Sequence, residues 1–257
     1  MSSVRTRSLW SDRAISILSP LVLLGLWEIC ARTGIVDVRF FPAPSNIIGH
    51  LFELASSGAL WRHVGASLYR LAAGFIVGCV PAIVIGLAIG LYRPVRAAFD
   101  PLISATYPIP KSSLLPLILL IFGLGESSKI AMVAIGVFYP VVINTAAGVR
   151  QIAPIFLDVG RNFGASRFNM FRTVALPGAL PLIMTGIKLG AGMGLVLIAI
   201  AEMVGAKQGL GYMIWNAWEL FDVQTMYVGL FVIAIIGFVM NAGFDALERA
   251  IVPWRNG

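Results

Sequence analysis

The chain has 257 residues, of which 58% are hydrophobic and 12% are charged, and its mean hydropathy is +0.89. Soluble domains carry about a quarter charged residues, so this composition excludes an ordinary soluble globular protein. The formal net charge of +7 comes without a clustered basic element, which argues against a nucleic-acid-binding face.

Six apolar segments predict membrane-spanning helices. A helix needs about 20 predominantly apolar residues to cross the hydrocarbon core of a bilayer. Three of the segments contain no charged residue, and two contain a single lysine. We therefore expect an all-α integral membrane protein with about six transmembrane helices, forming one domain over 1–257. The predicted spans are 14–31, 71–92, 101–125, 130–149, 177–201 and 223–244.

The first span follows a basic stretch with Arg5, Arg7 and Arg13, as a secretory signal peptide would. However, no convincing small-x-small cleavage pattern precedes Trp27 and Glu28, and a charged, aromatic end is typical of an interface anchor. We expect this segment to stay in the protein as a membrane helix.

The basic residues predict the orientation of the chain. With the N-terminus inside, the inner segments carry the excess of positive charge, as the positive-inside rule requires. Both termini and the 150–177 segment are then cytoplasmic. The inner arginines are Arg5, Arg7, Arg13, Arg93, Arg96, Arg150, Arg161, Arg167, Arg172, Arg249 and Arg255. The outer basic residues are Arg32, Arg39, Arg62, Lys129 and Lys207, with Arg70 at the mouth of the second span.

The segment after the first span predicts a surface helix. Pro42 and Pro44 favour an extended turn, and Ser45 is a good N-cap. Apolar residues at helical spacing follow over 47–55. The pattern predicts an amphipathic helix that covers the bundle or lies in the membrane interface.

Glycines recur at four-residue intervals within the spans. Small residues at this spacing let helix backbones approach closely, so they predict tight helix packing. A transport lumen would use the same spacing, and the pattern does not separate the two. The glycines are Gly74 and Gly78, Gly86 and Gly90, and Gly186, Gly190 and Gly194.

The third span is interrupted by Pro108, Pro110 and Pro116. Broken helices are tolerated in membranes where neighbours or a water-filled cavity satisfy the freed backbone groups. The prolines therefore indicate one of two features in the segment 107–113, which begins at Tyr107. The segment is either a gate or a wall of the transport pathway, or it is a purely structural kink.

Ionisable residues within spans are functional candidates because burying a charge is expensive. Lys111, Lys188 and Glu202 meet this description. A cation at either lysine would lower the barrier for an anionic substrate. Alternatively, Lys188 snorkels or pairs with a buried acid, and Glu202 marks the outer interface.

A polar segment between the fourth and fifth spans, DVGRNFGASRFNMFRTVALPGALP, covers 158–181. Apolar residues over 151–163 fall on one side of a helix, and Gly164 is suited to end it. Ser166 is a suitable N-cap for a second short helix, and Pro177 suits the first turn of the next span. The pattern predicts a bent pair of short helices, which is either a connector resting on the membrane or a docking element.

This polar segment resembles the EAA loop of the permease subunits of ATP-binding-cassette importers. Asp158, Val159 and Gly160 occupy the E-A-A positions of that loop. Gly164, Ala165 and Ser166 match its G-A-S step. The downstream pattern is matched by Phe171, Leu176, Pro177 and Pro181. The aspartate shortens the carboxylate arm, and valine and glycine replace two alanines. These departures affect the expected fine geometry of the contact more than its existence.

The similarity extends over nearly the whole chain. The stretches FPAPSNI, SLYRLAAGF, PIPKSSLLPLILLIFGLGESSKI, FYPVVINTAAGVR and IAEMVGAKQGLGYMI look like the subfamily that imports nitrate, sulfonates, taurine or bicarbonate. The resemblance implies the fold of a type I importer permease, a place in the bacterial inner membrane and a small anion as the substrate.

The resemblance also implies partners. It implies a second permease chain, expected to be identical, two ATPase subunits and an extracytoplasmic substrate-binding protein. The chain has no GxxxxGK[ST] phosphate loop, so ATP and Mg are expected on the ATPase, with no cofactor, metal or catalysis here. The implied ATPase-coupling residues are Asp158, Val159, Gly160, Gly164, Ala165, Ser166, Phe168, Phe171, Leu176 and Pro177. The candidate pathway residues are Tyr107, Lys111, Lys188 and Glu202.

The alternative is a stand-alone channel or a membrane-embedded enzyme. An enzyme would need histidine, carboxylate or cysteine side chains gathered at one depth. His50 and His63 instead lie in an extracytoplasmic segment and look like interfacial residues. The permease is therefore the favoured interpretation.

Overall fold

The structure, a computed structural model, describes residues 3–256 apart from the side chains of 3–14, 17, 161, 167, 255 and 256. All regular secondary structure in these residues is helical, which confirms the predicted all-α class. The chain forms two compact units. Unit 1 comprises Met1–Trp61 with Met213–Phe231, and unit 2 comprises Arg62–Tyr212 with Val232–Gly257.

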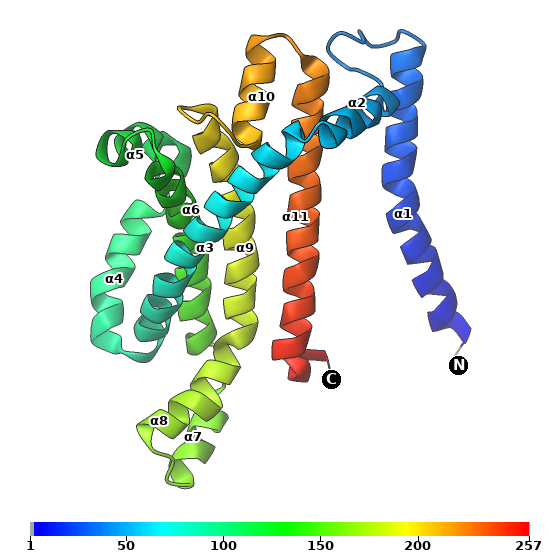
Figure 1. Cartoon of the computed structure of the whole chain (residues 1–257). Helices are drawn as coiled ribbons and strands as arrows, with labels where there is room; N and C mark the ends of the chain where they lie inside the picture. Colours follow the sequence, from blue (N-terminus) through cyan, green and yellow to red (C-terminus); the bar gives the residue numbers. More distant parts are fainter. Residues whose placement is uncertain (1–2, 257) are drawn as a thin grey trace. The chain divides into compact units, whose positions relative to one another are not determined.

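Figure 1 shows the helices in chain order. They are α1 (Ser3–Arg32), α2 (Pro44–Ser56), α3 (Ala59–Leu91), α4 (Arg93–Thr106), η1 (Lys111–Leu114), α5 (Leu115–Phe122), α6 (Glu126–Arg150), α7 (Pro154–Asn162), α8 (Arg167–Met170), η2 (Phe171–Ala175), α9 (Leu176–Met203), α10 (Leu210–Glu219), α11 (Val223–Ile251) and η3 (Pro253–Asn256). Of the three η elements, η1 and η3 are 3-10 helices and η2 is a π-helix.

Four stretches of helix are long and apolar enough to cross a membrane: Ala59–Leu91, Glu126–Arg150, Phe168–Met203 and Val223–Ile251. They correspond to four of the predicted spans. A fifth crossing results if α4 and the 111–122 segment, which meet at 90°, count as one broken span. The segment 14–31 lies in α1, whose side chains are only partly described, so a sixth span stays a prediction.

The predicted interruption of the third span is confirmed, with one correction. Pro108 and Pro110 lie between the end of α4 and the start of η1. Pro116 does not break a helix, because it lies in the first turn of α5. Proline is tolerated there since the first N–H groups of a helix have no intrahelical partner.

In unit 1, the predicted amphipathic helix is present as α2, but the predicted N-cap is wrong. The helix begins at Pro44 after Ala43, and no side chain caps it. The Ser45 hydroxyl instead donates to Glu28 at 2.8 Å, and its backbone N–H donates to the same carboxylate at 3.0 Å. Proline at the first helical position has no N–H that needs a cap, so Ser45 is free to bond α1.

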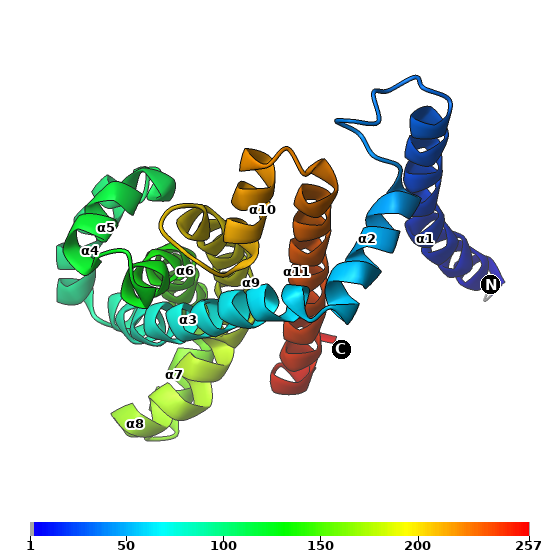
Figure 2. The same cartoon turned by 45° about the horizontal axis from the view of Figure 1, so that its top comes forward.

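In unit 2, α6 packs against α3 on one side and α9 on another (Figures 1 and 2). The contacts are made through the predicted glycines. A Cβ atom at Gly74 of α3 would lie 2.5 Å from that of Val133, and one at Gly186 of α9 would lie 2.9 Å from that of Asn144. These distances confirm the predicted close packing, because real Cβ atoms do not approach so near.

Candidate functional site

The α7–α8 segment (residues 154–175) contains two short helices joined by a tight turn (Figure 1). After α7 ends at Asn162, Gly164 has φ +69°, a conformation that glycine adopts without strain. The N–H of Ala165 donates to the carbonyl of Gly160 at 3.0 Å, a bond typical of a Schellman helix end. The predicted helix break at Gly164 is confirmed.

The second helix begins as the sequence predicts. The Ser166 hydroxyl accepts the backbone N–H of Asn169 at 3.2 Å, which is an N-cap bond. The chain then passes through the π-helix η2 directly into α9, with Pro177 in the first turn of α9. The helical path from Phe168 to Met203 is therefore continuous.

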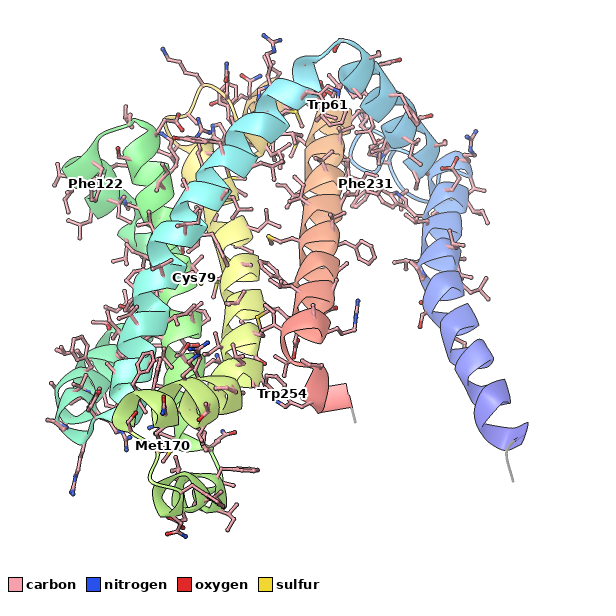
Figure 3. All side chains as sticks on the ribbon, turned by 60° about the horizontal axis from the view of Figure 1, so that its bottom comes forward. Trp61, Cys79, Phe122, Met170, Phe231 and Trp254 are labelled. Atoms are coloured by element: carbon pink, nitrogen blue, oxygen red, sulfur yellow. The ribbon has the colours of Figure 1, made fainter. Side chains whose placement is uncertain are left out.

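Gly160 lies where α7 and α8 contact each other closely. A Cβ atom at Gly160 would lie 2.6 Å from the Cε atom of Met170, the residue labelled at the end of α8 in Figure 3. An alanine fits at this position only if the flexible methionine moves. The glycine in place of the second family alanine therefore suits the contact between α7 and α8 in this chain.

The α7–α8 segment exposes an apolar surface. Five of its apolar side chains are between 46% and 88% exposed: Ile155, Phe156, Val159, Phe163 and Phe168. Phe171, in contrast, is half-buried. A group of exposed aromatic and aliphatic side chains is typical of a surface that contacts a partner protein or a membrane.

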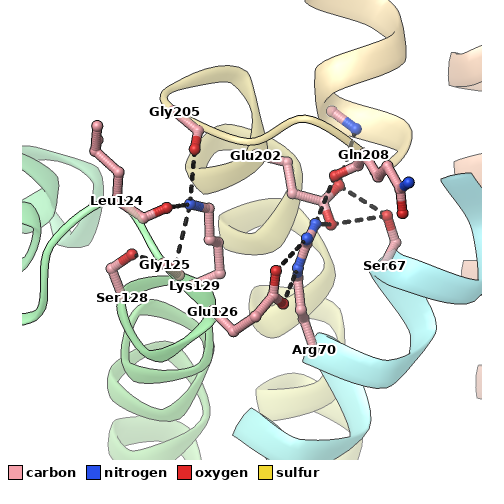
Figure 4. Close-up of polar contacts among 12 residues, drawn as sticks. Ser67, Arg70, Leu124, Gly125, Glu126, Ser128, Lys129, Glu202, Gly205 and Gln208 are labelled. Carbon is pink, nitrogen blue, oxygen red and sulfur yellow. Dashed lines mark hydrogen bonds and ion pairs between the residues drawn. The ribbon is translucent and has the colours of Figure 1, made fainter.

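A second constellation, the Arg70 cluster, consists of Ser67, Arg70, Glu126, Lys129 and Glu202 in unit 2 (Figure 4). The guanidinium donates to both Glu126 oxygens at 2.6 and 2.7 Å and to Glu202 at 2.9 Å. Glu202 is fully buried and also accepts the Ser67 hydroxyl at 2.7 Å. A buried carboxylate with this many donors is a satisfied structural group.

Lys129 completes the Arg70 cluster from the first turn of α6. Its ammonium donates to three backbone carbonyls, those of Leu124, Gly125 and Gly205 (Figure 4). Its side chain is 1% exposed, although the sequence pattern places it in an outer segment. The lysine ties the turn before α6 to the turn after α9.

Lys111 lies at the 90° bend. Its ammonium donates to the carbonyls of Thr106 and Tyr107 at 2.9 and 3.0 Å, at the end of α4. It also lies 3.9 Å from the ring centre of Tyr139 on α6, a cation–π distance. The side chain therefore satisfies carbonyls that the broken helix leaves open.

Lys188 pairs with two acids. Its ammonium contacts the carboxylates of Asp245 and Glu248 on α11. The alternative expected for this residue, pairing with an acid, is thus observed. Its role in a transport pathway stays a prediction.

Comparison with known proteins identifies the family. Residues 82–256 match the family described as "Binding-protein-dependent transport system inner membrane component". The chain belongs to this family. As a member of it, the protein is a multi-pass membrane permease of an ATP-binding-cassette importer, which works with ATPase and binding-protein partners.

Similar permeases include the taurine transport system permease protein TauC of Escherichia coli (strain K12), which is 35% identical over 94% of this chain and 90% of its own. The putative aliphatic sulfonates transport permease protein SsuC of Bacillus subtilis (strain 168) is 32% identical over 93% of this chain and 87% of its own. These relatives do not favour the channel or enzyme alternative, since permease subunits leave catalysis to a separate ATPase.

Solved structures support the fold. A chain in the structure "Inward facing conformations of the MetNI methionine ABC transporter" matches with a TM-score of 0.54 and 22% identity, over 75% of this permease and 94% of that chain. This similarity confirms the importer permease fold expected from the resemblance.

The predicted coupling residues lie together in one contiguous segment, whereas the predicted pathway residues do not form one site. Tyr107 and Lys111 meet at the bend, Lys188 pairs with α11, and Glu202 is enclosed in the Arg70 cluster. Sequence reasoning missed the cluster. A signal was present, because Arg70 directly precedes the uncharged 71–92 segment and implies a partner.

Proposed function

We propose that this permease imports a small sulfonate, and that its α7–α8 segment docks in a groove of the partner ATPase. The proposal includes a second, identical permease chain that completes the pathway, and a cytoplasmic location of the α7–α8 segment and both termini. ATP and Mg belong to the ATPase in this account. The substrate class rests on relatives named for taurine and aliphatic sulfonates.

The exposed apolar surface of the α7–α8 segment is the observation that supports ATPase docking. Phe163 and Phe168 are 88% and 67% exposed, and they flank the turn at Gly164. Hot spots at protein interfaces are typically such aromatic anchors on a fixed backbone. Here the Schellman bond and the Ser166 cap fix the backbone between them.

The helical connection explains how docking would move the membrane domain. The chain is continuously helical from Phe168 to Met203, so a displacement of α8 is transmitted to α9. Gly160 lets α7 contact α8 closely, which keeps the two short helices together. In this proposal the segment is a rigid element that couples ATP-driven closure to movement of the spans.

The ten coupling residues have two kinds of role in this proposal. Phe168, Val159 and Asp158 contact the ATPase directly. The others hold the segment in shape: Gly160, Gly164, Ala165, Ser166, Phe171, Leu176 and Pro177.

Of the candidate pathway residues, we propose that Tyr107 and Lys111 at the bend line the transport pathway. Tyr107 is 51% exposed, and the nearby Lys111 supplies positive charge for an anion. Lys188 is the weaker candidate since two carboxylates neutralise it. Glu202 is the weakest because it is fully buried.

The test of ATPase docking is copurification of the ATPase with a Phe163→Ala/Phe168→Ala permease. We expect retention of the ATPase to fall at least about tenfold, since two aromatic anchors are removed. The control is Phe221→Ala, which removes an equally exposed phenylalanine from another turn. Equal retention by both variants would contradict the proposed docking surface.

A second variant tests coupling separately from docking. Gly164→Pro cannot adopt a φ of +69°, so it should distort the turn between the helices. We expect loss of substrate-dependent ATP hydrolysis in the assembled complex. Full substrate-dependent hydrolysis by an assembled Gly164→Pro complex would rule out the coupling role.

A further inference from the structure

A cavity of about 280 Å³ lies within unit 2, where α4 runs beside the ends of α3 and α6 (Figure 2). Its apolar lining comes from core residues, since Ile89, Val142 and Ala146 are at most 5% exposed. Four polar side chains also line it: Asp100, Ser104, Tyr107 and Arg150. An apolar cavity with a few convergent polar groups is the usual form of a small-molecule site.

The polar atoms of these four side chains are not hydrogen-bonded or ion-paired within the described residues, although the Tyr107 ring contacts Tyr139 and Lys111. The carboxylate of Asp100 and the guanidinium of Arg150 thus line one cavity without pairing with each other. Both charges remain available to a ligand.

Asp100 is exceptional among the acids of this permease. The chain has 12 acidic residues, of which Asp12 is outside the described side chains. Ten of the remaining eleven have a hydrogen-bond or ion-pair partner, and Asp100 has none among the side chains that the structure describes. Because a half-buried carboxylate without donors is unfavourable, its position needs an explanation beyond stability.

The charges of the cavity select a ligand class. A carboxylate calls for an ammonium, and a guanidinium calls for an oxyanion such as a sulfonate or phosphate. The apolar lining suits the short carbon linker between them. Two sources supply this chemistry: a free aminosulfonate such as taurine, and the ethanolamine phosphate headgroup of a lipid.

The position of the cavity connects it to the α7–α8 segment. Asp100 directly precedes the predicted span 101–125, and Arg150 directly follows the predicted span 130–149. Arg150 is also the last residue of α6, and α7 begins four residues later at Pro154. A ligand that bridges Asp100 and Arg150 would fix α4 to the helix end from which the α7–α8 segment departs.

We infer that this cavity, the Asp100 cavity, is a binding site for a small zwitterion that carries an ammonium and an oxyanion. Asp100 binds the ammonium, and Arg150 binds the oxyanion. The inference rests on the proposed function, which supplies a sulfonate as the transported substrate. A transported aminosulfonate would occupy this cavity at the end of the membrane path.

The test measures equilibrium binding of radiolabelled taurine to the permease–ATPase complex without binding protein, in nanodiscs of phosphatidylcholine and phosphatidylglycerol. We expect Asp100→Asn to weaken taurine binding about tenfold and to leave ethanesulfonate, which has no ammonium, unchanged. Arg150→Gln should weaken both ligands. Asp37→Asn and Arg93→Gln, which change exposed charges outside the cavity, should change neither.

Lipid is distinguished from free ligand in a second set of nanodiscs. If phosphatidylethanolamine lowers taurine affinity in the wild type but not in Asp100→Asn, the headgroup occupies the same site, which also supports the inference. The inference is overturned if the wild type shows neither taurine binding nor this lipid effect. It is also overturned if wild type and Asp100→Asn bind taurine with equal affinity.

A labelling experiment covers the case in which a charge variant does not fold. In a background without Cys30 and Cys79, taurine should slow maleimide modification of Ser104→Cys at the exposed rim of the cavity. Unchanged modification would contradict the inference. Taurine uptake by cells separates this inference from the proposed function. If cells take up taurine but the cavity does not bind it, only the inference is overturned. If the cavity binds taurine but cells do not take it up, only the proposed substrate is overturned.

Discussion

The two ends of α6 hold charged residues in opposite states. At its start, Glu126 and Lys129 belong to the Arg70 cluster, in which every charge has partners (Figure 4). At its end, Arg150 lines the cavity with Asp100 of α4, and neither side chain has a hydrogen-bond or ion-pair partner in the part of the chain that the structure describes. Helix α6 thus contributes to a closed network that stabilises the fold at its start and, at its end, to an open pair with Asp100 of α4 that is suited to a ligand.

The largest expected effect comes from opening the closed network. Arg70→Ala leaves Glu202 buried without its cation, and breaking a buried ion pair in this way costs about 3–5 kcal/mol. We expect thermal unfolding of the purified permease in detergent to show a loss of this size, or a failure to accumulate folded protein. Arg39→Ala, which breaks an exposed ion pair with Asp37, should leave thermal stability nearly unchanged, because exposed ion pairs contribute little. Equal stability of both variants would show that the Arg70 cluster is not structural.

An intermediate effect is expected in the middle of α6, between the two charged ends. Gly86→Ala would place a Cβ atom 2.6 Å from that of Thr145 and 2.8 Å from the Val142 carbonyl, so helix α3 must move. We expect a loss of about 1–3 kcal/mol in unfolding free energy. The control is Gly192→Ala, where nothing lies within 4 Å and the substitution should stabilise by about 0.5–1 kcal/mol. A stable Gly86→Ala variant would contradict the close packing of α3 on α6.

The smallest effect on stability is expected at the open end. Asp100→Asn removes a charge that pairs with no described residue, so the free energy of unfolding should change by no more than about 0.5 kcal/mol. The same thermal unfolding measurement as for Arg70→Ala gives the comparison directly. A loss of several kcal/mol would mean that Asp100 belongs to the scaffold, and the contrast between the two ends of α6 would disappear.

Local sequence signals predicted the local structure. The glycine spacing predicted close helix packing, and Gly164, Ser166 and Pro177 marked the turn, cap and helix start that are observed. Each of these depends on residues a few positions apart. The exception is Ser45, whose partner Glu28 lies 17 residues away.

Long-range partners could not be predicted. Arg70 and Glu202 are 132 residues apart in the sequence, and Lys188 and Asp245 are 57 apart. The sequence identifies such residues as charges that need partners, but the partner depends on which helices pack together. For the same reason, the predicted spans did not indicate that Asp100 and Arg150 line one cavity.

The central claim is that the α7–α8 segment contacts the ATPase, and site-specific photo-crosslinking tests it most directly. A benzophenone amino acid is placed at Phe168, or as a control at Leu120 of α5, which is 83% exposed. In a transport-competent complex, we expect position 168 to form a crosslink with the ATPase and position 120 to form none. A complex that transports substrate while position 168 never crosslinks to the ATPase would contradict the account.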